Sequence, residues 1–164
     1  VEALEAQLTV YRDTSEVSRL NQQAYVQPVV VEQRLFELLT QAKELWQATG
    51  GALDITSGAL TKVWGFHRRQ GRLPSEAEVA QALTQVGSQH LEFDASRKSV
   101  KFLVPGLEIN LGAIGKGHTL DRCAELLASR GIDDFLIHGG NSSVLARGKR
   151  KAESGKRRAV SGQR

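Results

Sequence analysis

The amino-acid sequence predicts an α/β or α+β domain in which helices pack on a mixed sheet. Segments with the alternation of strands follow segments with the period of helices, and no unit of about 20–50 residues repeats. The composition, with 40% hydrophobic and 24% charged residues in 164, is typical of a soluble globular domain. These observations favour a layered domain over a solenoid or a disordered chain.

The first half of the chain is expected to begin with a strand and to continue with helices. Residues 7–12 (QLTVYR) alternate like a strand, and Thr14 or Ser15 can cap the short helix that follows. Leucines and an alanine at helical spacing predict a long helix over residues 31–49, which a Gly-Gly pair terminates.

Another helix is expected over residues 75–86. Ser75 and Glu78 have the spacing of a capping box, and Gly87 is expected to be the C-terminal cap.

The last third of the chain is expected to alternate between strands and one helix. Residues 90–94 and 98–104 predict a hairpin, and residues 108–111 predict a short strand that enters a glycine-rich turn. Apolar residues at helical spacing predict a helix that ends at Gly131, and residues 135–138 resume as a strand.

Composition restricts the function classes. No apolar run reaches the roughly 20 residues that a membrane-spanning helix needs. The single cysteine, Cys123, cannot form an internal disulfide, and its place in an apolar helical repeat favours a buried thiol.

The net charge of +4 is concentrated at the C-terminal end. Residues 147–164 hold eight Lys or Arg and one Glu, which leaves a net charge of −3 on the other 146 residues. Residues 149–164 have one large apolar side chain and no periodicity, so we expect a folded domain over residues 1–148 and a disordered basic tail. No aromatic residues interleave with the basic ones to stack on bases, so we expect no nucleic-acid partner.

Three glycine-rich segments are candidates for chemistry. In the first, GGALDITSG over residues 50–58, the glycines allow a ligand to approach the backbone, and Asp54 can accept hydrogen bonds from a ribose or a ring N–H. The alternative is structural: a helix C-cap with an Asx turn, followed by a core contact between Trp64 and Phe66.

The second segment, INLGAIGKG over residues 109–117, predicts a strand, a glycine-rich turn and the N-terminus of a helix that carries Lys116. Free N–H groups, the helix dipole and the ammonium group all favour phosphate, so a diphosphate site is expected here. The segment is neither a Walker A sequence nor a G-x-G-x-x-G motif, which argues against a nucleotidase or a Rossmann domain.

The third segment, IHGGNSS over residues 137–143, places two glycines after an apolar strand. No other His, Cys or carboxylate lies nearby at metal-ligand spacing, so His138 is expected to be a hydrogen-bonded structural residue. The four histidines do not cluster, and no Ser-His-Asp arrangement is visible, so the catalytic residue is unknown.

Three blocks in order, TVYRDTSEVSRLNQ, GGALDITSGALTKVWGF and INLGAIGKGHTLDRCAELLASRGIDDFLIHGGNSSVLARG, resemble successive blocks of the ApbE family of FAD:protein FMN transferases. The resemblance covers residues 6–148 and implies an ApbE-like fold. It also implies that parts of the family sequence are missing. We expect a front M-G-T-like segment to precede Val1, and a magnesium-binding Asp and Thr and an H-I-I-D-P-like block to follow Gly148.

The resemblance implies a flavin site. Tyr11 matches the family aromatic residue that packs on the flavin, and Ala52, Leu53 and Asp54 match the loop that lines FAD. Leu53 departs from the family pattern, because phenylalanine is usual there.

The long third block implies the rest of the site. Asn110 and Lys116 match positions beside FAD and its phosphates, and Ala113 lies where the family places a Mg²⁺ ligand, here through its backbone carbonyl. Asn110 stands where aspartate is common, and His118 where tyrosine is common.

The activity that the resemblance implies is the Mg²⁺-dependent transfer of FMN from FAD to a Thr or Ser hydroxyl of an acceptor protein, with release of AMP. The alternatives are a Mg²⁺-dependent FAD pyrophosphatase, which forms FMN and AMP, and a non-catalytic flavin-binding remnant. Family members commonly act at the cell envelope, so an extracytoplasmic location is expected, with membrane attachment only through an N-terminal anchor outside this chain.

Overall fold

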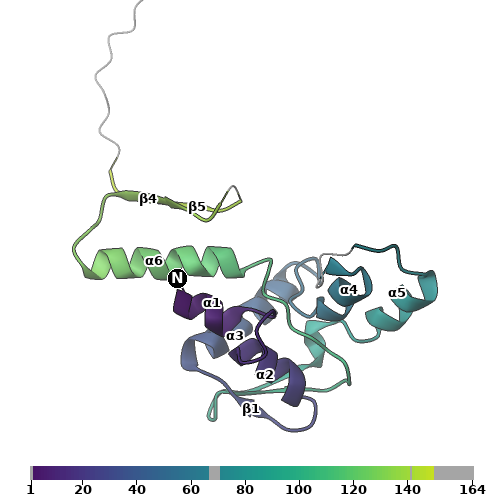
Figure 1. The fold of residues 1–164 in the computed structure, drawn as a ribbon. Helices are drawn as coiled ribbons and strands as arrows, with labels where there is room; N and C mark the ends of the chain where they lie inside the picture. Colours follow the sequence, from purple (N-terminus) through teal and green to yellow (C-terminus); the bar gives the residue numbers. More distant parts are fainter. Residues whose placement is uncertain (1, 67–70, 141, 150–164) are drawn as a thin grey trace, which may run out of the picture.

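The computed structural model describes residues 2–66, 71–140 and 142–149. It confirms the predicted combination of helices and sheets (Figure 1). Strand ladders in the described part are antiparallel, and parallel pairing is limited to one isolated bridge between Ser57 and Glu108. The sheet component is therefore two small antiparallel sheets in place of one mixed sheet.

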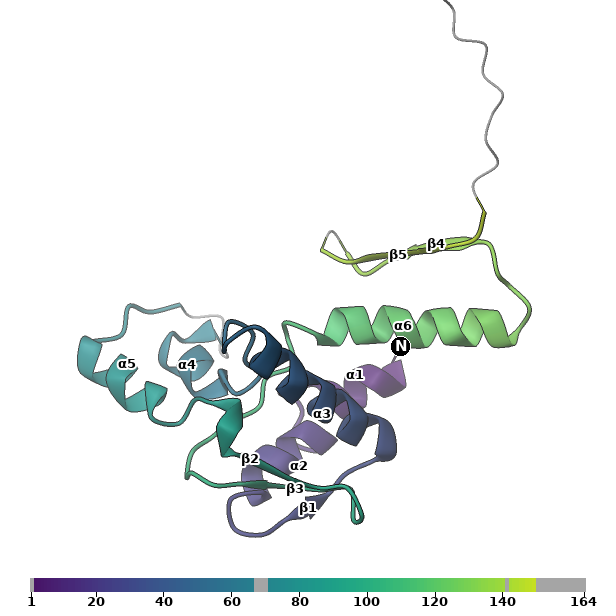
Figure 2. The same cartoon turned by 180° about the vertical axis from the view of Figure 1, so that it is seen from behind.

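The main body combines two helices with a three-stranded sheet (Figure 2). Its helices are α2, Glu16–Gln23, and α3, Gln33–Ala48. Its strands have the order β1-β3-β2 and are β1, Val29–Val30; β3, Ser99–Phe102; and β2, Leu91–Asp94. Leu91 faces Phe102 and Asp94 faces Ser99 across the predicted hairpin, which is thereby confirmed.

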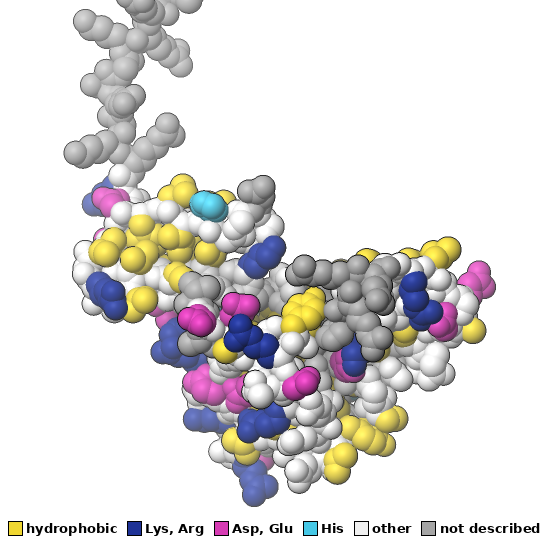
Figure 3. Space-filling view, viewed as in Figure 1, with side chains coloured by type: hydrophobic (Ala, Val, Ile, Leu, Met, Phe, Trp, Pro, Cys, Tyr) yellow, Lys and Arg dark blue, Asp and Glu magenta, His cyan; other side chains and the backbone are white. Residues whose placement is uncertain are grey.

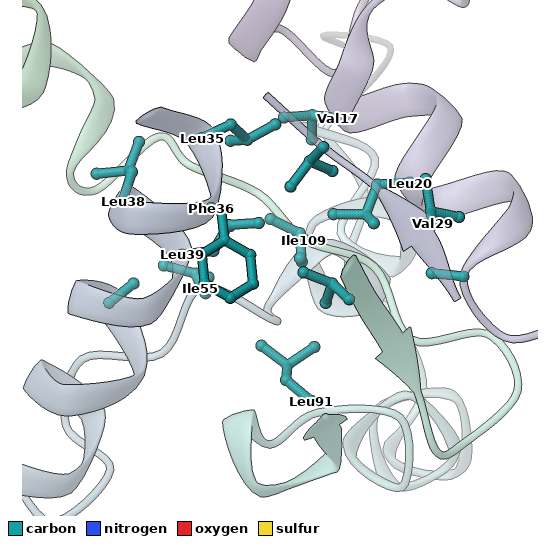
Figure 4. Close-up of a cluster of buried hydrophobic side chains, with 14 of the residues drawn as sticks. Val17, Leu20, Val29, Leu35, Phe36, Leu38, Leu39, Ile55, Leu91 and Ile109 are labelled. Carbon is teal, nitrogen blue, oxygen red and sulfur yellow. The ribbon is translucent and has the colours of Figure 1, made fainter. Parts of the chain in front are cut away.

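The core lies between these helices and the sheet. Figure 4 shows Leu20 of α2, Leu39 of α3 and Leu91 of β2 around Ile109, which comes from the irregular segment before α6. Ile109 and Leu39 are completely buried. Burying a side chain of this size stabilises the fold by about 1.5–3 kcal/mol, so this cluster holds the body together.

The long predicted helix is confirmed as α3. It buries Leu35, Leu38 and Leu39 at helical spacing on one face. At its end Gly50 has a φ of +60°, and the N–H of Gly51 donates to the carbonyl of Trp46 at 2.8 Å. A residue with a side chain is disfavoured at such a φ, which explains the glycine stop.

Helices α4, Gly58–Val63, and α5, Glu76–Leu83, lie together beside the main body. The capping box at Ser75 is confirmed: its hydroxyl accepts from the N–H of Glu78, and the Glu78 carboxylate accepts from the N–H of Ser75. The N–H of Ser75, the guanidinium of Arg72 and the hydroxyl of Ser75 all donate to the Glu78 carboxylate and lower its pKa to about 2.

The predicted end of α5 is wrong, because the helix stops at Leu83 with Thr84 as its cap. Gly87 instead has a φ of +139° and precedes a 3₁₀ turn over Ser88–His90. Its N–H donates to the hydroxyl of the buried Thr56 at 2.7 Å, and this tertiary bond takes the place of helix capping.

A separate layer follows. Helix α6, Gly115–Ser129, contacts the antiparallel pair of β4, Phe135–His138, and β5, Val144–Arg147. Figure 3 shows apolar side chains gathered over this layer. Leu126, Leu136 and Val144 are more than half exposed.

The expected strand over residues 7–12 is wrong. The chain forms helix α1, Glu2–Leu8, and then a turn. Leu4 and Leu8 are one helical turn apart in a run rich in Glu, Ala and Leu, which are strong helix formers. The β-favouring residues Thr9 to Tyr11 follow them, but no strand of the described part pairs with these residues.

Two further expectations are corrected. Residues 108–111 are not a strand, because one edge of the segment meets the Asn21 side chain and not another strand. Cys123 is half-buried and not buried, because α6 turns Leu120 and Ala124 to the inside.

Among the described residues, no helix has the length and apolar character that crossing a bilayer requires. Of the basic tail only Lys149 is described, and its N–H donates to the Asp134 carboxylate at 3.1 Å. The expected disorder over residues 150–164 lies outside the described residues.

Ser15, not Thr14, caps α2, and this assignment can be tested. Its hydroxyl accepts from the N–H of Ser18 at 3.0 Å and donates to the carbonyl of Thr9 at 2.5 Å, while the residue is 1% exposed. Ser15→Ala should lower the free energy of unfolding by about 1–2 kcal/mol, because the buried N–H of Ser18 and the half-buried carbonyl of Thr9 lose their partner. Urea unfolding measures this. The exposed Thr14→Ala is the control, and an equal effect of both variants would contradict the assignment.

Candidate functional site

A large cavity of about 510 Å³ lies between α1 and α6, which are close together in Figures 1 and 2. Its walls come from α1 and the turn after it, from the glycine-rich turn before α6, from the first turns of α6, and from the end of β4. The lining residues are Leu4, Glu5, Leu8, Thr9, Val10, Tyr11, Asn110, Leu111, Gly112, Gly115, Lys116, Thr119, Leu120 and Gly139.

Three predicted site residues, Tyr11, Asn110 and Lys116, meet in this lining. Tyr11 lies in the turn after α1, and its N–H donates to the Thr9 hydroxyl at 3.1 Å. The carbonyl of Thr9 accepts from Ser15, so the cap of α2 also holds this wall of the cavity in place. Tyr11 thus shares one site with Asn110 and Lys116, which lie 99 and 105 positions later in the sequence.

The opposite wall is a tight turn. The N–H of Asn110 donates to the carbonyl of Ile55 at 2.7 Å, and the Asn110 side-chain oxygen accepts from the N–H of Gly112 at 2.9 Å. The carbonyl of Leu111 then accepts from Gly115 at 2.7 Å, which leads directly into α6. These bonds place the first turn of α6 against the cavity.

The start of α6 favours an anion. No side chain caps the helix at Ile114, and Lys116 lies in the first turn. A helix N-terminus carries partial positive charge, and an ammonium group adds to it. The Lys116 Nζ donates to the Ser142 hydroxyl at 3.0 Å, a bond that an incoming anion can replace.

The remaining walls are mainly apolar, although Glu5 and Thr119 also line them. Leu4, Leu8 and Leu120 line the same cavity as Lys116. A ligand with a flat apolar part and an anionic part would therefore match both kinds of wall.

A smaller cavity of about 150 Å³ adjoins the first and shares Val10 and Asn110 with it. It is lined by polar side chains, including the ion pair of Lys62 with Glu108. Asn21 lies here too.

Sequence reasoning gave Asn21 no role, although a signal existed. Asn21 falls at helical spacing with Val17, Leu20 and Ala24, which are buried in the core. A polar side chain on a core-facing stripe needs a hydrogen-bond partner, and here the partner is the backbone of Ile109.

The other predicted flavin contacts lie outside the lining of the large cavity. Leu53 packs against the core, and Ala52 is exposed in the turn after α3. Their predicted roles stay predictions. The expected core contact of Trp64 with Phe66 is corrected: the rings stack with centroids 6.4 Å apart, but Phe66 is 60% exposed.

Asp54 has a structural role in the fold. One carboxylate oxygen accepts from the N–H of Thr56 at 2.8 Å and from the Ser88 hydroxyl at 2.8 Å, and the other accepts from the N–H of Ser88 at 3.1 Å. The Asx turn that was the structural alternative is thus present. The nucleotide contact predicted for Asp54 stays a prediction.

Ala113 is exposed between Gly112 and Ile114, at the edge of the large cavity. Within residues 2–66, 71–140 and 142–149, no three His, Cys, Asp or Glu side chains gather in a way that could hold a metal ion. The metal-ligand role of Ala113 stays a prediction.

The histidines of the described part lie apart from this site. His118 and Asp121 line a groove between α3 and α6 instead of the large cavity. Nδ1 of His138 lies 3.1 Å from the carbonyl oxygen of Gly140, in agreement with the expected hydrogen-bonded role.

The comparison with protein families shows to which family the chain belongs. The model of the ApbE family matches residues 1–161. The chain belongs to the ApbE family. This confirms the resemblance seen in the three sequence blocks.

Curated relatives in the family carry a common name. The chain is 32% identical over 147 residues to a FAD:protein FMN transferase of Vibrio cholerae, covering 88% of this chain and 43% of the relative. It is 31% identical over 140 residues to the FAD:protein FMN transferase of Salmonella typhimurium, covering 82% of this chain and 40% of the relative. The chain thus spans less than half the length of these relatives.

Solved structures agree on the fold. The flavin transferase ApbE from Vibrio cholerae superposes with a TM-score of 0.82 at 30% identity, over 90% of this chain and 47% of that one. The apo form of the flavinyl transferase ApbE from Pseudomonas stutzeri gives a TM-score of 0.82 at 27% identity, over 90% of this chain and 46% of that one. The predicted fold class is confirmed.

The Asp54 network generates a prediction about stability. Asp54→Asn replaces one carboxylate oxygen, an acceptor, with an NH₂ group, a donor. That NH₂ group then faces a donor of Thr56 or Ser88, so the free energy of unfolding should fall by about 1.5–3 kcal/mol. Thermal or urea unfolding measures the change. Asp13→Asn, at an exposed carboxylate, is the control. If Asp54→Asn is as stable as the control, the network does not anchor the 3₁₀ turn.

Proposed function

We propose that this chain forms the FAD-binding part of an enzyme that transfers FMN from FAD to a Thr or Ser hydroxyl of an acceptor protein and releases AMP. The observation that carries the proposal is the large cavity, where apolar walls meet the N-terminus of α6 and Lys116 in a chain of the ApbE family. FAD combines a flat apolar ring system with a diphosphate, so its two parts suit the two kinds of wall.

The proposed reaction is a displacement at phosphorus. The acceptor hydroxyl oxygen forms a bond to the phosphorus of the FMN half of FAD, and the bond from that phosphorus to the bridging oxygen breaks. AMP leaves with the bridging oxygen, and the hydroxyl proton passes to a base. Negative charge builds up on the diphosphate, so Lys116 and the positive end of α6 would stabilise it.

Other residues of the chain would orient the substrate. Tyr11 lies on the wall opposite the start of α6, where its ring can lie along the flavin. Asn110 lines both cavities and can contact FAD between its two ends. Holding the diphosphate in line with the acceptor hydroxyl is the larger part of catalysis in a reaction of this type.

Mg²⁺ is the expected cofactor, but the described residues do not form its site. Mg²⁺ needs a near-octahedral set of oxygen ligands, usually including carboxylates. Ala113 can offer a single carbonyl, and among the described residues Glu5 is the only carboxylate in the lining of the large cavity. Further ligands would have to come from outside the described residues, and the proposal assigns no reaction step to the ion.

The first test concerns binding. Lys116→Ala removes an ammonium group from the cavity lining, and the Kd for FAD should rise about tenfold, equivalent to about 1.4 kcal/mol. Titration of FAD fluorescence or calorimetry measures it. Lys101→Ala, on β3 away from the cavity, is the control. An unchanged Kd in Lys116→Ala would contradict the phosphate contact.

The second test concerns turnover. Residues 1–148 can be joined to the part of the Vibrio cholerae relative that this chain does not cover. Each protein is incubated with FAD, Mg²⁺ and an acceptor protein that carries a flavinylation threonine, and AMP and protein-bound flavin are measured. The chimera should release AMP and label the acceptor in equal amounts, while the 164-residue chain alone should do neither.

The outcomes separate the alternatives. AMP and free FMN without acceptor labelling would indicate a pyrophosphatase. Binding of FAD without turnover in the chimera would indicate a non-catalytic flavin-binding protein. An acceptor in which valine replaces the threonine should stay unlabelled if the hydroxyl is the attacking group. The location at the cell envelope stays a prediction.

A further inference from the structure

The segment that leads into the cavity wall, residues 108–110, crosses the core without belonging to a sheet. Extended backbone in this position needs partners for its N–H and C=O groups, because burying them unpaired is unfavourable. The partners come from two sides, and only one of these is backbone.

On the backbone side, the chain runs beside residues 55–58. The N–H of Asn110 donates to Ile55 at 2.7 Å, and the N–H of Gly58 donates to Glu108 at 3.0 Å. The approach is so close that a Cβ on Gly58 would lie 2.6 Å from the Cβ of Glu108.

On the other side stands one side chain, Asn21 of α2. Its Nδ2 donates to the carbonyl of Ile109 at 3.0 Å, and its Oδ1 accepts from the N–H of Ile109 at 2.8 Å. A carboxamide that pairs with both groups of one residue does what a neighbouring strand would do. Residues 55–58 thus pair with Glu108 and Asn110, and Asn21 pairs with Ile109 between them.

We propose that Asn21 is a positioning residue that places the cavity wall of residues 110–116 for ligand binding. The inference rests on the proposed FAD site and adds a residue that does not touch the large cavity. Ile109 is fully buried, and both its backbone groups are paired with Asn21, so burial and hydrogen bonding together oppose its displacement. The position of Ile109 therefore sets where the chain leaves the core at Asn110. The Asn110 side chain then accepts from the N–H of Gly112 and closes the turn that precedes Lys116.

A charge substitution tests the pairing with little change of shape. Asn21→Asp keeps an acceptor for the N–H of Ile109 but places a second oxygen against the Ile109 carbonyl. At pH 8 the Kd for FAD should rise about tenfold, and the Ile109 and Gly112 amides should exchange their hydrogens faster with solvent. Gln23→Glu, the same amide-to-carboxylate change at an exposed position of α2, is the matched control and should alter neither.

Acid rescue distinguishes positioning from a general loss of structure. Burial and the facing carbonyl raise the pKa of the new carboxyl, and the protonated form regains an O–H donor for Ile109. The defect should be complete above that pKa and should disappear as the pH falls below it. Asn21→Leu should show no such recovery. Asp13, Lys62 and Glu108 line the same small cavity, so the wild type is titrated over the same pH range.

The outcomes test the positioning role of Asn21 separately from the proposed function. Equal FAD affinity and equal amide exchange in Asn21→Asp and the wild type at pH 8 would overturn the positioning role, as would a defect that acid does not reverse. If the wild type itself fails to bind FAD, the proposed function fails, while faster exchange at Ile109 and Gly112 in Asn21→Asp would still establish the positioning. If Asn21→Leu does not fold, Asn21→Asp at low pH retains the pairing and allows the comparison.

Discussion

The burial of Ile109 is the constraint on which the rest of this structure depends. Its side chain lies at the centre of the core formed by α2, α3 and the three-stranded sheet, while the next residue, Asn110, lines both cavities. Core and site are therefore one residue apart. Any force that holds Ile109 in the core also sets where the glycine-rich turn and α6 begin.

The cavity has one mainly apolar wall and one wall that attracts anions, because α1 lines it with its side and α6 lines it with its N-terminal turns. Helix α1 contributes Leu4 and Leu8 from its side, so its wall is mainly apolar, with Glu5 as its charged member. Helix α6 contributes its N-terminal turn, where backbone dipoles and Lys116 make the wall attractive to anions. A nucleotide with a flat ring at one end and phosphates at the other fits such a pair of walls.

Lys116 and Asp54, which were both selected from sequence motifs, have different surroundings in the structure. Lys116 lies at the mouth of the cavity, with one exchangeable partner in Ser142. Asp54 is engaged with Thr56 and Ser88, both completely buried, and so joins the loop after α3 to the turn before β2. Both positions match the family pattern, yet Lys116 lines the large cavity while Asp54 supports the fold. Family positions include residues kept for packing as well as residues kept for chemistry.

The sequence by itself determined the family, through its three motif blocks, and the fold class. It also determined α3 with its glycine stop, the capping box at Ser75 and the hairpin of β2 with β3. Local spacing and capping rules govern these last three features. Only the tertiary structure decided what lies beside residues 108–111 and 7–12. A strand needs a partner, and no local pattern tells whether that partner will be another strand, as for β3, or the side chain of Asn21, 88 positions away from Ile109. The same holds for the cavity, whose walls are distant in sequence and meet because the fold places α1 opposite the start of α6.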